Sequence, residues 1–197
     1  MKNWLFVFIL LPVLSGSVFA QHPMLDQMTV QQEGTYVFIN WTISIGETCN
    51  GIKIERAVNS SMFEQIGFID GECGNPGFAV SYSFTDFHPV ANAYNIYRLD
   101  LGGRGYTDEV SVFYVNTKEK GYVLSSNPIL PDTKLYINNP RAENWILKIY
   151  RSNGQIDSQR QTNSDFFMLN SVEFNSGLYL FSISNGTQIF SGKFVVI

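Results

Sequence analysis

The sequence predicts an all-β protein with two β-sandwich domains in tandem. Three observations support this fold class. Short segments alternate strictly between apolar and polar residues, Gly, Pro and Asn separate these segments, and no window has a convincing 3.6-residue apolar period. The chain has 197 residues, of which 45% are hydrophobic and 15% aromatic, so it has enough apolar side chains to bury a core.

The first twenty residues have the features of a secretory signal peptide. Lys2 precedes an apolar run over residues 4–14, which is too short for a membrane-spanning helix, and Val18-Phe19-Ala20 resembles a cleavage site. We therefore expect cleavage between Ala20 and Gln21 and export of the residues that follow. An N-terminal membrane anchor is the alternative.

The clearest strands of the first half are residues 37–45, 82–86, 94–101 and 107–115. In residues 37–45 the odd positions are apolar, with Trp41 at the centre, so one face should be buried and the other wet. A Gly-Gly-Arg-Gly turn, which tolerates positive φ, joins the last two segments.

The segment between the first two of these strands predicts a hairpin that would place the two cysteines opposite each other. Residues 52–56 and 63–68 flank a turn at Asn59-Ser60-Ser61, so paired residues should have numbers that add up to about 120. Cys49 and Cys73 nearly satisfy this register, and export permits disulfides to form. We predict a disulfide that closes the open end of the hairpin. A redox-active pair is the alternative, although the C-x-x-C spacing is missing.

A charged break at residues 118–121 precedes a second series of strands. We place the domain boundary at residue 120, so the first domain covers residues 21–120 and the second covers 121–197. Asn153-Gly154 and Asn185-Gly186 indicate hairpin turns in the second domain. The apolar residues that alternate along its strands are Leu135, Ile137, Leu147, Ile149, Phe167, Leu169, Tyr179, Phe181, Ile183, Phe194 and Val196.

The second half also contains an ordered set of short motifs. An Asn-Pro follows a short strand, and a d-x-L-x-I strand covers residues 132–137. A strand and turn that end in Gly come next, followed by an L-x-x-G-x-Y element with Phe174 in the Leu place. A Lys precedes the final apolar residues. In this order and position the set resembles the type A sorting domain of the type IX secretion system. Ser126 and Ser171 depart from the family pattern. The residues that match are Asn127, Pro128, Gly154, Gly177, Tyr179 and Lys193.

This resemblance implies an Ig-like sandwich that acts as an export address. The protein would cross the inner membrane through the Sec translocon and be recognised by the outer-membrane translocon of the type IX system. A sortase-like protease would remove the sorting domain. The remainder would be joined to anionic lipopolysaccharide at the cell surface or released into the medium.

The first half is similar to the fibronectin type III-like domain that often precedes such sorting domains. That family supplies no catalytic residues to carry over. The matching residues are Trp41, Ile54, Glu55, Arg56, Phe63, Ile66, Gly67, Tyr82, Phe84, Asp86, Tyr97, Arg98, Leu99 and Asp100.

The composition offers little for catalysis, metal binding or nucleic-acid binding. A formal charge of −4 provides no basic surface for nucleic acid, and two His and two Cys are few for a metal cage or a His-based site. His22, His88 and the carboxylate pairs Asp70/Glu72 and Asp108/Glu109 lie in or beside polar segments that are typical of solvated surface. We therefore predict no enzymatic activity and no cofactor.

One group of residues is a candidate binding surface. The loops after the second, fourth and sixth strands of a sandwich lie at the same end, and here they carry Glu47, Asp70, Glu72 and Arg104 beside the predicted disulfide. Oxygen ligands at this end could hold Ca²⁺, although the spacing matches no calcium motif. Polar loops that keep the domain soluble are the alternative.

The leading functional hypothesis is a non-enzymatic exported protein whose first domain binds a surface protein or a glycan. A structural spacer or assembly component of a surface complex is the second hypothesis, and a hydrolase with an unfamiliar site is the third. Fold alone does not decide among them.

Overall fold

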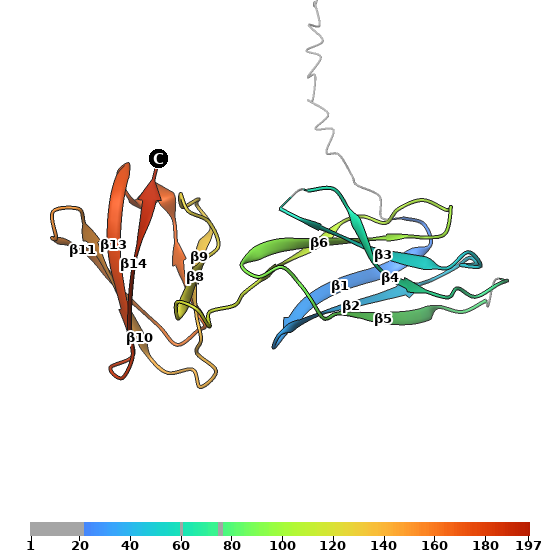
Figure 1. Ribbon diagram of the computed structural model, residues 1–197, viewed down its shortest axis with the longest axis horizontal. Coiled ribbons are helices and arrows are strands. Elements are labelled where there is room, and N and C mark those ends of the chain that lie inside the picture. The colour runs from blue at the N-terminus through green and yellow to red at the C-terminus, as the bar shows by residue number, and fades with distance from the viewer. Residues whose placement is uncertain (1–21, 60, 75–76) are drawn as a thin grey trace, which may run out of the picture.

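The computed structural model describes residues 22–59, 61–74 and 77–197, which form two β-sandwiches in series (Figure 1). The all-β prediction is confirmed. The predicted signal peptide and its cleavage site at Ala20 and Gln21 lie outside the described residues, as does Ser60 of the predicted turn. A short 3-10 helix at Ser171–Glu173 interrupts the strands, and the described part of the chain has no helix with the length and apolarity that a bilayer crossing requires.

The first sandwich packs a three-stranded antiparallel sheet on a four-stranded one. Alternate residues of the strands point inward, and the core includes Val37, Ile39, Trp41, Tyr97 and Leu99. The first sheet has the order β1 (Leu25–Glu33), β2 (Tyr36–Ile43), β5 (Val80–Asp86), and the second has the order β4 (Glu64–Ile69), β3 (Ile52–Val58), β6 (Ala93–Asp100), β7 (Val110–Tyr114).

The second sandwich has the same three-on-four arrangement of antiparallel strands. All eleven apolar residues predicted to alternate along its strands are buried, which confirms their inward orientation. The smaller sheet has the order β12 (Phe166–Leu169), β9 (Thr133–Ile137), β8 (Tyr122–Leu124), and the larger has the order β11 (Ile156–Thr162), β10 (Trp145–Arg151), β13 (Gly177–Ser184), β14 (Ile189–Val196).

The two sandwiches have separate hydrophobic cores that share no residue. The expected boundary at residue 120 falls between the end of β7 and the start of β8. The rings of Phe113 and Tyr136 stack at this junction, with their centroids 5.7 Å apart and an interplanar angle of 10°.

Three features of the first sandwich differ from the sequence expectations. β2 ends at Ile43, and Ile45 is 61% exposed, because the chain leaves the sheet at Ser44, whose N–H donates to the Met24 carbonyl. β7 begins at Val110, because the Thr107 hydroxyl instead accepts a hydrogen bond from the Leu99 N–H. β1 was not expected, because most of its residues are polar and it shows little apolar alternation.

Candidate functional site

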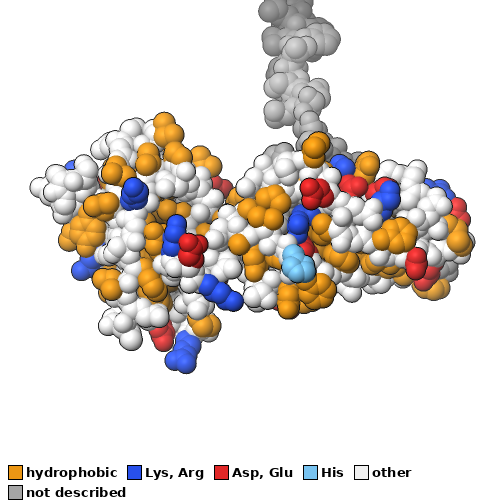
Figure 2. Space-filling model, in the orientation of Figure 1, with side chains coloured by type: hydrophobic (Ala, Val, Ile, Leu, Met, Phe, Trp, Pro, Cys, Tyr) orange, Lys and Arg blue, Asp and Glu red, His pale blue; other side chains and the backbone are white. Residues whose placement is uncertain are grey.

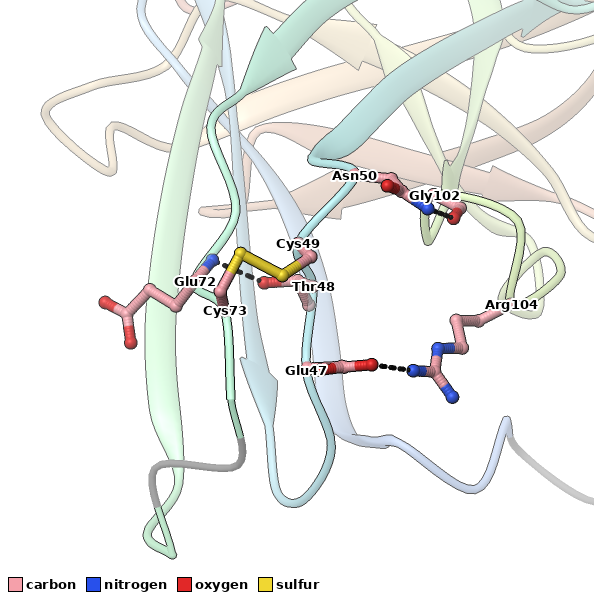
Figure 3. The surroundings of a disulfide bond; sticks show 8 residues. All are labelled: Glu47, Thr48, Cys49, Asn50, Glu72, Cys73, Gly102 and Arg104. Atoms are coloured by element: carbon pink, nitrogen blue, oxygen red, sulfur yellow. Dashed lines mark hydrogen bonds and ion pairs between the residues drawn. A yellow bond between two sulfur atoms is a disulfide. The ribbon is translucent and has the colours of Figure 1, made fainter.

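The predicted disulfide closes the β3–β4 hairpin at one end of the first sandwich (Figure 3). Cys49 and Cys73 are joined, with their Cα atoms 4.4 Å apart. Within the hairpin Lys53 pairs with Phe68 and Arg56 with Glu64, so the paired numbers add up to 121 and 120. The register predicted from the sequence is therefore confirmed, and the cysteines continue it beyond the strands.

The loops after β2, β4 and β6 meet at this end, as the sandwich topology predicts. The Thr48 N–H donates to the Glu72 carbonyl at 2.9 Å, and the Glu72 N–H donates to the Thr48 hydroxyl at 3.0 Å. On the other side, the Asn50 amide donates to the Gly102 carbonyl at 2.8 Å. These bonds cross-link the three loops around the disulfide.

The four charged residues predicted for this surface do not converge on one ligand. Arg104 pairs with Glu47, whereas the side chain of Glu72 points away from that pair (Figure 3). Asp70 is exposed to solvent. Across residues 22–59, 61–74 and 77–197, no three His, Cys, Asp or Glu side chains are grouped so that they could hold a metal ion. The calcium hypothesis therefore has no ligand set at this loop end.

Both histidine residues form hydrogen bonds that involve the backbone. The Nδ1 atom of His22 accepts the Met24 N–H at 3.2 Å, which leaves Nε2–H to donate to the Arg104 carbonyl at 3.0 Å. The exposed His88 uses its own backbone N–H and carbonyl to contact Asp86 and Arg56.

A buried ionisable cluster, which sequence patterns did not identify, joins the two sheets of the first sandwich. Asp86 on β5 accepts hydrogen bonds at Oδ2 from Arg56 of β3 at 2.7 Å and from the Tyr97 hydroxyl of β6 at 2.9 Å. Its other oxygen accepts the His88 N–H at 2.9 Å. Burial first, and then the Asp86 carboxylate, raises the pKa of Tyr97 above its ordinary value. The Asp86 carboxylate therefore connects side chains of both sheets through hydrogen bonds.

A cavity of about 720 Å³ lies between the two sandwiches. Much of its polar lining is already paired. The Gln32 amide donates to the Val115 carbonyl and accepts the Val115 N–H, both at 2.8 Å, and the Asn139 amide donates to the carbonyls of Glu143 and Asn163. Lys118, Asn138 and Asp165 also line this cavity.

Most of the sorting-motif residues build the second sandwich. The Asn127 side-chain oxygen accepts the Val195 N–H at 2.9 Å, and the Pro128 carbonyl, which follows a cis peptide bond, accepts the Ser126 hydroxyl. Gly177 pairs with Val196 in the final hairpin. The buried Tyr179 donates its hydroxyl to the Asn175 carbonyl at 3.0 Å.

The other two motif residues are Gly154, which lies in a separate turn, and Lys193, which is exposed on the surface. Gly154 has a φ of 83° at the β10–β11 turn, at the end of that hairpin. Lys193 is exposed on β14 and lines a groove of about 370 Å³ together with Asn127. Glu119 and Lys120 of the segment between the sandwiches line the same groove, so part of the motif is adjacent to that segment.

The outer face of the β1-β2-β5 sheet is a second surface that sequence patterns did not single out. Apart from Glu33, which pairs with Tyr36 at one corner, its residues are uncharged, and they point away from the core. We call it the neutral face, and it consists of Gln27, Thr29, Gln31, Tyr36, Phe38, Asn40, Thr42, Ser81, Ser83, Thr85 and Phe87.

The surface in Figure 2 shows Lys and Arg side chains interspersed with Asp and Glu, without a broad region of one sign.

Comparison with known proteins finds likeness to solved structures but no match by sequence. No family model matches the chain, and no curated protein matches it. A solved two-domain fibronectin type III segment of chicken tenascin is similar over 87% of this chain and 98% of that one, with 12% identity and a TM-score of 0.32. The sheet topology itself shows two all-β sandwiches in tandem.

Proposed function

We propose that the type IX secretion system exports this chain, that the second sandwich is its sorting domain, and that the first sandwich is a non-enzymatic binding module. The observation that carries the proposal is the ordered motif set from Asn127 to Lys193. Each motif is short, but their order and their position in the second sandwich match the family pattern. The Sec translocon, the outer-membrane translocon and a sortase-like protease are the partners that this route requires.

The placement of the motif residues supports a division of labour within the second sandwich. Asn127 and Tyr179 hold the final strands in place, whereas Lys193 is exposed and accessible to a receptor. Lys118, Glu119 and Lys120 between the sandwiches are also exposed, so a protease could reach this segment. After cleavage the first sandwich would remain at the surface on anionic lipopolysaccharide or enter the medium.

The absence of enzymatic activity is part of the proposal. The half-buried Arg56 pairs with the buried Asp86, and Glu47 and Arg104 form an ion pair at the loop end. A hydrolytic site would instead need an acid, base or nucleophile directed at a substrate position. A binding module needs only an exposed surface of suitable chemistry.

Fractionation of a host strain with and without the secretion system tests the export route. An antibody against residues 21–120 would follow the protein in periplasm, cell surface and medium. We expect surface or medium delivery in the intact strain and accumulation of the unprocessed chain in the periplasm of the mutant. Unchanged surface delivery in the mutant would refute the proposal.

A point variant separates recognition from folding. Lys193→Ala removes an exposed charge, and Lys148→Ala on β10, which β13 separates from β14 in the same sheet, is the control. We expect Lys193→Ala to reduce surface delivery while its melting temperature stays unchanged, and Lys148→Ala to be delivered normally. Normal delivery of Lys193→Ala would exclude this side chain from recognition.

A further inference from the structure

We propose that the neutral face of the first sandwich binds an uncharged polysaccharide that lies across β1, β2 and β5. This inference rests on the proposed binding function of that sandwich and is independent of the export route. It moves the predicted binding surface from the disulfide-bonded loop end to the face of a sheet.

Strand register arranges the neutral face as rows that cross the sheet. Thr29 pairs with Asn40 and Asn40 with Ser83, which makes one row. The neighbouring rows are Gln27–Thr42–Ser81 and Gln31–Phe38–Thr85, and beyond them Tyr36 lies beside Phe87. Strand geometry makes this face about 20 Å long and about 10 Å wide. An extended chain several sugar units long therefore has room to lie along it.

The side chains of the neutral face match the chemistry of a sugar. Hydroxyl and amide groups can each donate and accept hydrogen bonds, as sugar hydroxyls do. Gln27, Asn40 and Ser83 line a groove of about 320 Å³. Within the part of the chain that the structure describes, the amides of Gln27 and Asn40 form no side-chain hydrogen bond, so both remain available to a ligand.

Two exposed aromatic rings lie at one end of the neutral face, beyond the row Gln31–Phe38–Thr85. Tyr36 is 41% exposed and Phe87 is 60% exposed, and their rings meet edge to face with centroids 5.1 Å apart. Exposed rings of this kind offer apolar surface to the C–H groups of a sugar ring. Polar rows beside an aromatic end therefore supply both kinds of contact that a polysaccharide can make.

The charge pattern favours an uncharged ligand. Glu33, at the corner of the neutral face, is hydrogen-bonded to the Gln31 amide. The opposite outer face of the same sandwich is charged and carries the ion pairs Lys53–Asp100 and Glu55–Arg98. An acidic polysaccharide or a nucleic acid would require Lys or Arg on the surface that it contacts. A neutral polymer requires none.

A protein partner fits this surface less well. The centre of a protein interface is usually its most apolar part. Here Tyr36 and Phe87 lie at one end of the face, and Phe38 is the single aromatic residue within the three rows, where all its companions carry hydroxyl or amide groups. The arrangement therefore favours a ligand that is polar along its whole length.

Affinity electrophoresis of the mature chain, residues 21–197, tests the inference directly. Native gels would contain a soluble β-glucan, xylan or galactomannan, with polygalacturonate as the charged probe. We expect at least one neutral polysaccharide to slow migration and polygalacturonate to have no effect. Absence of retardation by all three neutral polymers, or equal retardation by polygalacturonate, would overturn the proposal.

Matched substitutions on the two outer faces locate the site. Ser83→Lys places a charge on the neutral face, and Ser111→Lys makes the same change at an exposed position of β7 on the opposite sheet. We expect Ser83→Lys and Phe87→Ala each to lower the affinity derived from the retardation about tenfold. Ser111→Lys should leave this affinity unchanged. Equal binding by Ser83→Lys and the unaltered chain would contradict the assignment. Because this assay involves no export, its failure is distinguishable from failure of the secretion proposal.

Discussion

Asp86 connects the two sheets of the first sandwich through its carboxylate. It is 5% exposed, and its oxygens accept hydrogen bonds from Arg56, Tyr97 and the His88 backbone. The sequence places Asp86 at the inward end of an alternating strand but gives no sign that Arg56 reaches it from the other sheet. Local patterns identify which face a residue occupies, whereas a cross-sheet ion pair depends on the packing of both sheets.

Removal of this carboxylate should strongly destabilise the first sandwich. Asp86→Ala leaves the Arg56 charge buried without its partner, so we expect the free energy of unfolding to fall by about 3–5 kcal/mol. Glu47→Ala, which breaks the more exposed pair with Arg104, should cost at most about 1 kcal/mol. Urea unfolding followed by tryptophan fluorescence measures both. Similar losses in the two variants would contradict this account.

Tyr97 predicts a pH dependence at the alkaline end. Burial, followed by the Asp86 carboxylate, raises the pKa of its phenol, so the folded state retains the proton that the unfolded state loses near pH 10. This contribution to stability is complete below that pH and falls by about 1.4 kcal/mol per pH unit above it. Urea midpoints from about pH 8 to 11 should decline less steeply in Tyr97→Phe. Parallel curves for the two proteins would exclude the effect.

At the scale of elements, the β3–β4 hairpin and its disulfide hold the loop end together. The hairpin register alone locates the Cys49–Cys73 bond, because the sequence separation and the turn determine which residues face each other. The directions of Glu47 and Glu72 could not be predicted in this way. They depend on backbone bonds such as those between Thr48 and Glu72.

Loss of the disulfide should destabilise the first sandwich measurably. The bond closes a loop with a sequence separation of 24, for which chain entropy gives about 3 kcal/mol. Cys49→Ser with Cys73→Ser should lower the free energy of unfolding by that amount and shift the unfolding midpoint down, and reductant should then have no further effect. An unchanged midpoint in the double variant would show that the other loop contacts suffice.

Gly71 is the tightest point of the same loop end. A Cβ atom there would lie 1.5 Å from the Thr48 carbonyl oxygen, so Gly71→Ala must push the loops apart. At Gly74, a Cβ atom would meet nothing within 4 Å, although its positive φ adds backbone strain. We expect Gly71→Ala to lower the melting temperature more than Gly74→Ala. The reverse order would show that the loops relax easily.

At the scale of the whole molecule, the alternating pattern predicted both sandwiches and the core of the second one. The pattern failed for β1, whose inward positions include Gln32 and whose outward positions are Gln, Thr and Glu. The neutral face was missed for the same reason, since it becomes visible only when β1 pairs with β2. Surfaces built from several strands depend on topology, which one strand's sequence does not contain.

Processing should leave a defined product at the cell surface. The segment between β7 and β8 is exposed at residues 118–120 and is adjacent to Lys193. Mass spectrometry of the surface form should find Gln21 at its start and an end between Val115 and Asn127. A surface form that still contains the second sandwich would argue against removal of the sorting domain.

The most direct test of the central claim is delivery of a chain that ends at Thr117. Full-length and shortened proteins would be expressed at equal levels in the same strain and quantified in periplasm, cell surface and medium. If the second sandwich is the export address, the shortened chain accumulates in the periplasm while the full-length chain reaches the outside. Delivery of the shortened chain as efficient as that of the full-length chain would contradict the account.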